Sequence, residues 1–289
     1  MLEDERHDAT VDELKRQLCV EELETDLYRG PATVGTLGRV FGGQVIAQAL
    51  AAASGSIGDG RFAHSLHAYF LRAGDNAKPI IYRVVRDFDG GSFANRRVVA
   101  TQDGKPIFNL AASFQRLEDG LSHQAEMPDV AGPQDALPMS RVFEQRGASV
   151  PGPIADRLAA FDVRFGGAVG KANDPAITPI RHAWFKLDPR LGPELARIAL
   201  AFVSDFGLIS TAIMPHGIDW FSPEVQGASL DHAIWFHDAP PLDKWLLYTM
   251  ESPWSGHARG FARGSVYDQA GRLIASMAQE GLMRHRPTT

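Results

Sequence analysis

The chain has 289 residues, of which 44% are hydrophobic and 22% are charged, and its formal net charge is −6. This length and apolar content suffice for one large domain or two small ones with buried cores. We do not expect nucleic acid as a partner, because binding to backbone phosphates needs a basic face. A ligand with only a few phosphates can still bind a local cluster of Arg or Lys side chains.

The single cysteine, Cys19, rules out an intramolecular disulfide and fits a reducing compartment. It lies in a charged segment with no catalytic signature nearby, so we interpret it as an ordinary thiol and not as a nucleophile. Residues 1–17 lack the apolar core of a signal peptide. No stretch approaches the roughly 20 apolar residues that a membrane span needs. We therefore expect a cytoplasmic protein with no membrane span.

The first half of the chain predicts one helix and four strands. In the segment GGQVIAQALAAA (42–53), the apolar residues recur at helical spacing. Gln102-Asp103-Gly104 is a strong signal for a hairpin turn. Runs of apolar, β-branched and aromatic residues predict strands at 64–72, 79–88, 92–102 and 105–116.

The second half repeats this order of elements. A stretch rich in proline and glycine, from about 117 to 153, comes first and predicts a linker. Apolar residues at helical spacing predict a helix over 194–213, with Pro193 suited to its first position. A hairpin turn is predicted at 269–271, between the last two strands. The predicted strands are 229–237, 244–252, 257–268 and 272–284.

The two halves also resemble each other in sequence. HAYFLRAGDNAKPIIYR (67–83) aligns with AIWFHDAPPLDKWLLYT (233–249), so that Tyr82 matches Tyr248 at an offset of 248 − 82 = 166. The same offset recurs at several other positions, which indicates a duplication.

One helix followed by a run of antiparallel strands, repeated once, predicts an α+β fold and not an alternating, doubly wound one. We place the N-terminal repeat at 12–117, a linker at 118–158 and the C-terminal repeat at 159–289.

The familiar catalytic signatures are absent from the sequence. It has no G-x-S-x-G elbow, no phosphate-binding loop and no G-x-G-x-x-G. His64 and His67 stand three apart in a predicted strand, so their side chains face opposite sides and are poor joint metal ligands. With no Cys cluster and no H-E-x-x-H, we expect no metal.

Three polar residues stand where the pattern favours apolar ones. Asp205 flanks the stripe of the second helix, and a carboxylate there must be paired, hydrogen-bonded or neutralised. From its position alone, a structural Asp that bonds a neighbouring loop is the commoner case. Ser229 opens a strand, where serine is usually just solvated. Gln279 lies inside an apolar strand, where it either satisfies a neighbouring strand or binds a ligand.

The three residues become specific through a resemblance that covers nearly the whole chain. The sequence resembles acyl-CoA thioesterase II, the TesB-type double-hotdog family. The matching segments occur in the family's order: RVFGGQVIAQAL (39–50), HSLHAYFLRAGD (64–75), GKPIFNLAASFQ (104–115), SDFGL (204–208), LDHAIWFH (230–237), ARGFARG (258–264) and AQEGLMR (278–284).

The resemblance implies a double hotdog, with two tandem repeats that are each a long helix wrapped by an antiparallel β-sheet. It also implies a catalytic Asp, Thr and Gln, which fall on Asp205, Ser229 and Gln279 in the C-terminal repeat. Serine at 229 keeps the hydroxyl of the usual threonine but lacks the β-branch that stiffens χ1. The implied reaction is hydrolysis of fatty acyl-CoA to fatty acid and CoA, with no cofactor.

Direct attack by water is the simplest scheme, because no Ser-His or Cys-His pair is apparent in the sequence. In this scheme Asp205 accepts the proton of the water, and Ser229 and Gln279 fix its direction. Backbone N–H groups at the Gly42-Gly43 start of the first helix are candidate donors to the oxyanion.

The sequence leaves the CoA phosphate site open, because Arg96, Arg97, Arg263 and other arginines compete for it. Family resemblance further implies a homo-oligomer, either a dimer or a tetramer of double-hotdog chains.

Two alternative functions stay open. A hotdog enoyl-CoA hydratase or dehydratase would use a His beside an Asp, and Asp231-His232 offers such a pair, although adjacent strand residues face opposite sides. A non-enzymatic acyl-CoA-binding protein would require the three polar residues to be incidental.

Overall fold

The computed structural model describes residues 2–33, 38–58, 60–145, 147–166 and 178–286. The chain divides into two compact units, and each unit combines separate stretches of sequence. Unit 1 comprises Met1–His123, Arg190–Phe206 and Asp231–Pro240, and unit 2 comprises Gln124–Pro189, Gly207–Leu230 and Pro241–Thr289.

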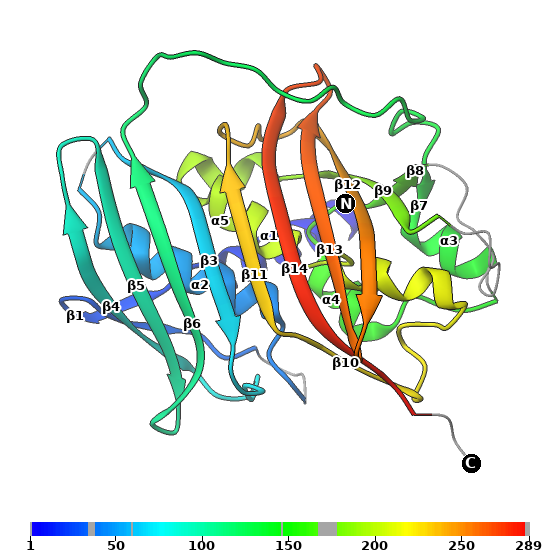
Figure 1. The fold of residues 1–289 in the computed structure, drawn as a ribbon, viewed down its shortest axis with the longest axis horizontal. Helices are drawn as coiled ribbons and strands as arrows, with labels where there is room; N and C mark the ends of the chain where they lie inside the picture. Colours follow the sequence, from blue (N-terminus) through cyan, green and yellow to red (C-terminus); the bar gives the residue numbers. More distant parts are fainter. Residues whose placement is uncertain (1, 34–37, 59, 146, 167–177, 287–289) are drawn as a thin grey trace. The chain divides into compact units, whose positions relative to one another are not determined.

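Unit 1 is an antiparallel sheet with helices packed on it. Its helices are α1 (Leu2–Leu18), α2 (Gly42–Gly55) and α5 (Gly192–Ser204), and the 3-10 turn η1 (Pro189–Leu191) leads into α5. Its strands are β1 (Glu21–Glu24), β2 (Leu27–Gly30), β3 (Phe62–Phe70), β4 (Ile80–Asp89), β5 (Phe93–Gln102), β6 (Lys105–Gln115) and β11 (Asp231–Phe236). They lie in the order β1-β2-β4-β5-β6-β3-β11 (Figure 1).

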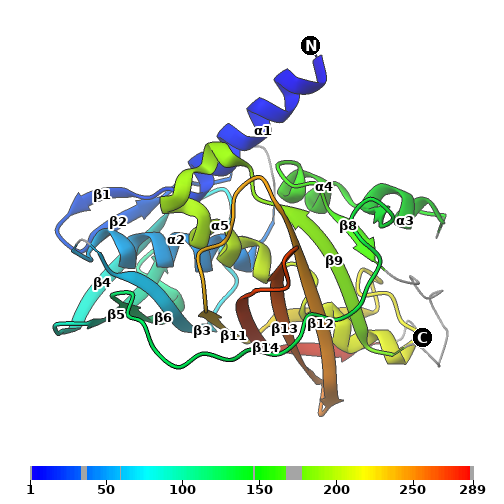
Figure 2. The same ribbon diagram turned by 90° about the horizontal axis from the view of Figure 1, so that it is seen from above.

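Helix α2 is the centre of this unit. It is apolar around most of its circumference, which is typical of a helix buried on all sides. It contacts β3, β4, β5 and β6 as well as α5 (Figure 2). The buried Gln48 on α2 donates to Gln17 O at 2.7 Å and accepts from Tyr82 Oη at 2.7 Å. Burial raises the pKa of Tyr82 well above its usual value, so this hydroxyl stays a donor.

The hairpin that joins β5 and β6 has the turn that the sequence predicts. Asp103 and Gly104 have φ values of 49° and 73°, the two positive angles of a type I′ turn. The strands pair antiparallel on both sides of it. The hairpin prediction at 102–104 is confirmed.

Unit 2 is also built on antiparallel strands. Its helices are α3 (Met139–Gln145), α4 (Gly152–Leu158) and the 3-10 helix η2 (Ile209–His216), which lies against β12, β13 and β14. Its strands are β7 (Leu137–Pro138), β8 (Arg164–Gly166), β9 (Ile180–Lys186), β10 (Val225–Ser229), β12 (Trp245–Gly256), β13 (Arg259–Asp268) and β14 (Leu273–His285). The order is β14-β13-β12-β9-β8-β7, and β10 also pairs with β14.

The helix predicted over 194–213 is wrong in its extent. Helix α5 ends at Ser204, and η2 begins separately at Ile209. Gly207 between them has a φ of 77°, the left-handed conformation in which helices commonly end. The apolar stripe continues past the break, so periodicity could not reveal it. As a result Asp205 caps the end of α5 and does not flank a continuous helix.

The sequence predicts no stretch as long and apolar as a membrane span, and this prediction is wrong with respect to length and composition. The stretch Pro189–His216 is long and apolar enough to cross a membrane, with a mean hydropathy of 1.7. However, 72% of the most apolar part of this stretch is buried inside the protein. Core helices have the same composition, and burial of this kind is their usual state.

The predicted linker, 118–158, is irregular only in part, since its second half contains β7, α3 and α4. The predicted domain boundaries follow the sequence repeats, whereas the compact units follow packing and include α5 and β11 in unit 1. The boundaries stay a prediction.

Candidate active site

Asp205 lies at the end of α5, beside the beginning of α2. It is 8% exposed, and the backbone N–H of the next residue, Phe206, donates to Val203 O at 2.9 Å. A Cβ atom on Gly42 would stand 2.5 Å from Asp205 Oδ2, so only glycine at position 42 leaves room for the carboxylate. Helix α2 has no acidic residue in its first turn and no side-chain cap at its N-terminus. The carboxylate of Asp205 therefore lies where a helix stabilises a negative charge.

Aromatic rings flank the same end of α2. The Phe70 ring lies 3.0 Å from the position that a Cβ on Gly42 would take. Phe41, which precedes the helix, packs edge-on against Phe202 of α5 with ring centroids 5.1 Å apart. These rings give the carboxylate an apolar surrounding on the side of α2.

Ser229 and Gln279 lie together in unit 2. Gln279 Nε2 donates to Ser229 Oγ at 3.0 Å. Ser229 is the last residue of β10 and stands opposite Gly281 on β14, two residues beyond Gln279. Adjacent to this pairing, the Leu230 N–H donates to Glu280 O at 2.9 Å. The ladder between the two strands therefore fixes the hydroxyl relative to the amide.

Gln279 points into unit 2, where its strand otherwise buries apolar residues. It is 0% exposed and follows the inward-facing Met277 at the strand period of two. The next inward position is Gly281, where a Cβ would stand 2.4 Å from Ile209 of η2. Glycine there allows η2 to lie directly on β14, next to the amide.

The structure brings two of the three predicted residues together and places the third in the other unit. The chain passes from unit 1 to unit 2 immediately after Phe206, one residue past Asp205. It returns to unit 1 after Leu230, one residue past Ser229. Asp205 and Ser229 therefore each lie next to a point at which the chain passes from one unit to the other.

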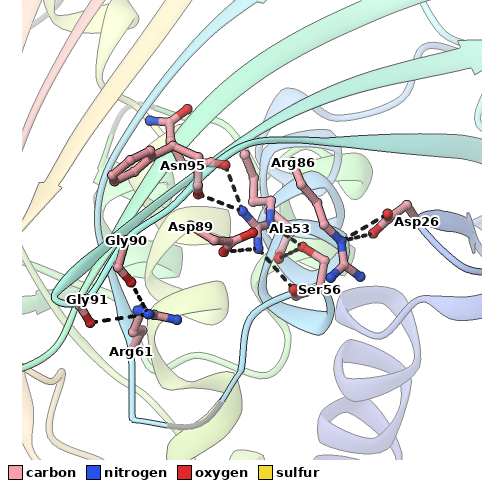
Figure 3. Close-up of polar contacts among 11 residues, drawn as sticks. Asp26, Ala53, Ser56, Arg61, Arg86, Asp89, Gly90, Gly91 and Asn95 are labelled. Atoms are coloured by element: carbon pink, nitrogen blue, oxygen red, sulfur yellow. Dashed lines mark hydrogen bonds and ion pairs between the residues drawn. The ribbon is translucent and has the colours of Figure 1, made fainter.

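Arg96 is unavailable for CoA phosphates. It is 1% exposed on β5, and its guanidinium donates to Ser56 Oγ at 2.8 Å and to Asp89 Oδ1 at 2.7 Å. Further bonds go to the carbonyl oxygens of Ser56, Phe88 and Asn95. Figure 3 shows Ser56, Asp89 and Asn95 gathered in this network.

The other two arginines considered for the phosphates are exposed and ion-paired. Arg97 contacts Asp87 at 2.6 Å, and Arg263 contacts Glu251 at 2.5 Å. Both side chains are accessible to a ligand, and nothing in their contacts favours one of them as the binding site of the CoA phosphates.

Arg96 also marks a difference between the repeats that sequence reasoning missed. It matches Ala262 in the second repeat (262 − 96 = 166), and Gln279 matches Ala112 in the first (279 − 112 = 167). Arg96 pairs with Ala112 across β5 and β6, and Ala262 pairs with Gln279 across β13 and β14. Each repeat thus has one inward polar side chain facing an alanine, on opposite strands of the hairpin. The signal was the placement of Arg96 at an inward position between Ala94 and Val98.

His232, the histidine of the alternative hydratase pair, is buried in unit 1. Its Nε2 lies 2.9 Å from Ser204 Oγ. Burial lowers the pKa of His232 to about 3, so the ring is neutral near pH 7. It is 1% exposed.

Within the described ranges, no three His, Cys, Asp or Glu side chains lie close enough together to hold a metal ion.

Comparison with known proteins decides the family. Residues 31–115 match the model of the acyl-CoA thioesterase N-terminal domain, and residues 126–283 match that of the acyl-CoA thioesterase C-terminal domain. Acyl-coenzyme A thioesterase 8 of Homo sapiens is 36% identical over 285 residues, covering 93% of this chain and 88% of that protein. The chain belongs to the acyl-CoA thioesterase II family.

Solved structures of similar proteins agree in fold. An acyl-CoA thioesterase II of Mycobacterium marinum is 37% identical, with a TM-score of 0.78, and covers 95% of this chain and 99% of its own. A hot dog fold protein of Alicyclobacillus acidocaldarius, 20% identical, has a TM-score of 0.76 over 95% of this chain and 98% of its own, and shows the fold alone. The predicted α+β double hotdog is confirmed. Membership in the thioesterase family does not favour the hydratase and non-enzymatic alternatives.

Proposed function

We propose that this thioesterase hydrolyses fatty acyl-CoA by direct attack of a water molecule that Asp205 deprotonates and that Ser229 and Gln279 orient. The observation that carries the proposal is the hydrogen bond between Ser229 and Gln279, because it pairs two residues that the family resemblance assigns to one site. The products are a free fatty acid and CoA.

Asp205 has the surroundings of a general base. Its side chain is 8% exposed, and its carboxylate lies beside the start of α2 close to the Phe70 ring. In such a position it can accept a proton from water and become neutral, while the N-terminus of α2 stabilises the negative charge that passes to the oxyanion. The N–H groups of a helix's first turn have no partners within the helix, so those of Gly42 and Gly43 are the proposed donors to the oxyanion.

The amide of Gln279 and the hydroxyl of Ser229 suit the orientation of a water. The amide carries a carbonyl oxygen as acceptor, and the hydroxyl can both donate and accept. Because Gln279 Nε2 donates to Ser229 Oγ, the hydroxyl proton of Ser229 is directed away from the amide. Serine lacks the β-branch that would limit rotation about χ1. The hydrogen bond from the Gln279 amide limits this rotation instead.

Replacing Asp205 with Asn tests the proposal. The substitution preserves size and removes the base, so kcat should fall by about 10²- to 10⁴-fold while the Kd for acyl-CoA changes little. Release of the CoA thiol reports turnover, and calorimetry with a slowly hydrolysed acyl-CoA reports binding. Near wild-type turnover in this variant would refute the role of Asp205, and a covalent acyl adduct seen by mass spectrometry would refute direct attack by water.

We also propose that copies of the chain associate into a dimer or tetramer. The outward positions of β3 and β11 carry exposed aromatic side chains, with Tyr69 60% exposed and His67 packed edge-on against Trp235. Exposed apolar faces of this kind are common at subunit interfaces. Light scattering after gel filtration measures the assembly, and a monomer at micromolar concentration would contradict it. The cytoplasmic location remains a prediction.

A further inference from the structure

Ser204 and His232 form a buried pair directly beside Asp205. The Ser204 Oγ lies 2.8 Å from Ala201 O and 2.9 Å from His232 Nε2. Ser204 is the last residue of α5, and His232 lies on β11, so both belong to unit 1. The pair therefore joins the end of the helix to a strand of the sheet.

The direction of these hydrogen bonds follows from counting protons. The Ala201 carbonyl can only accept, and the Ser204 hydroxyl has one proton to donate. If His232 carried its proton on Nδ1, that N–H would be buried with no acceptor among the described residues. Buried N–H groups without acceptors are rare and destabilising. The proton of the neutral ring is therefore on Nε2, which donates to Ser204 Oγ, and Ser204 donates to Ala201 O.

His232 has a firm support on the side of the sheet. Strand β11 pairs antiparallel with β3 along its length, and His232 stands opposite Ala68. With its Nε2 engaged by Ser204 Oγ and its pKa lowered to about 3 by burial, the ring is a poor base for a substrate proton. What it can do is fix the position of the last turn of α5.

The last turn of α5 in turn determines where Asp205 lies. Asp205 follows Ser204 directly as the C-cap of α5, and the N–H of Phe206 behind it donates to Val203 O at 2.9 Å within the same turn. The carboxylate has little freedom on its other side, because Oδ2 lies within 2.5 Å of the position of a Gly42 Cβ. A small rotation of the turn would move the carboxylate away from this place.

We propose that Ser204 and His232 are positioning residues that hold the Asp205 carboxylate in its reactive orientation. The inference rests on the proposed role of Asp205 as general base. It assigns to His232, which sequence reasoning considered only as a rival catalytic group, a role in the hydrolysis that requires no contact with substrate.

Four variants test the inference in the full-length protein: Ser204→Ala, His232→Leu, the double variant of these two, and His232→Gln. A displacement of about 1 Å can lower the rate about 10²-fold, so kcat for the first two should fall by about 10- to 100-fold. KM for an acyl-CoA should change by less than about threefold, because neither side chain touches substrate. The double variant should be no slower than the slower single variant, because both substitutions break one connection.

Glutamine at 232 provides the rescue. Its amide Nε2 can reach the place of the imidazole Nε2 and donate to Ser204 Oγ, so His232→Gln should recover most of the kcat that His232→Leu loses. His182→Gln is the matched control, because His182 is a half-buried histidine whose Nδ1, like that of His232, has no partner among the described residues, but it lies on β9 in unit 2. Its kcat should equal that of the wild type.

A background variant separates this inference from the proposed function. In Asp205→Asn, addition of Ser204→Ala should not lower the residual rate further, because its effect acts through the carboxylate. Wild-type turnover in Asp205→Asn would refute the proposed function itself. An inactive Asp205→Asn combined with wild-type kcat in Ser204→Ala and His232→Leu would overturn only the positioning role. So would kcat losses that disappear when the rate is expressed per folded molecule, as measured by circular dichroism.

Discussion

The contact between Gly42 and Asp205 shows how one absent side chain makes room for a functional one. Gly42 does not have a positive φ, so its backbone would accept any residue. What requires glycine is the Asp205 carboxylate, 2.5 Å from the position of a Cβ. The sequence shows two adjacent glycines before an apolar helix, but not which side chain approaches them from a segment about 160 residues away.

Substituting Gly42 with Ala should therefore reduce activity with little loss of fold. The added methyl group displaces the carboxylate, and we expect kcat to fall by about 10- to 100-fold. Gly58→Ala is the control, because a Cβ at Gly58 meets nothing within 4 Å. Steady-state kinetics and thermal melting of both variants check this expectation, and equal kcat values for the two would contradict it.

At the scale of elements, charge complements both ends of α2. Asp205 lies at its N-terminus, and Arg96 of β5 donates to Ser56, the residue that caps its C-terminus. Both charges have the sign that the helix dipole favours. The helix could be predicted from the period of its apolar residues, because that period is local. Its two charged partners could not, because each comes from another element.

Replacing Arg96 with Met should destabilise the protein. It removes a buried guanidinium and leaves the carbonyl oxygens of Ser56 and Asn95 without this donor, at a cost of about 2–4 kcal/mol in the free energy of unfolding. Arg97→Met on the same strand is the control, because Arg97 is 59% exposed and its ion pair is solvated. Urea unfolding measures both. A similar midpoint for the two variants would show that the Arg96 network is not stabilising.

At the scale of the whole molecule, the compact units do not follow the two repeats. Helix α5 and strand β11 come from the C-terminal half of the chain, yet they complete unit 1 by packing on α2 and pairing with β3. The repeat was visible in the sequence as a constant offset. The packing of α5 and β11 in unit 1 was not visible, because a constant offset indicates duplication and carries no information about which elements pack together.

A fragment of residues 1–123 should consequently fail to fold alone. It lacks the helix and the strand that cover α2 and the edge of β3, so apolar surface would remain exposed to water. The intact chain cleaved at a protease site inserted after Asp119, in an exposed irregular segment, should keep its native circular dichroism and its cooperative melting. Cooperative melting of the isolated fragment would contradict the expectation.

The sequence by itself predicted the repeat, the family resemblance and the strands β3 to β6 and β11 to β14, because periodicity, turn residues and matched segments are properties of adjacent residues. It did not predict β1, β2, β7, β8, β9 or β10. It also suggested Asp205, Ser229 and Gln279 through that family. Only the tertiary structure decided that α5 ends at Ser204, that Gln279 bonds Ser229 and that Arg96 is buried. The reason is physical: these features depend on which atoms fill the space next to a side chain, and that space is enclosed by elements distant in sequence.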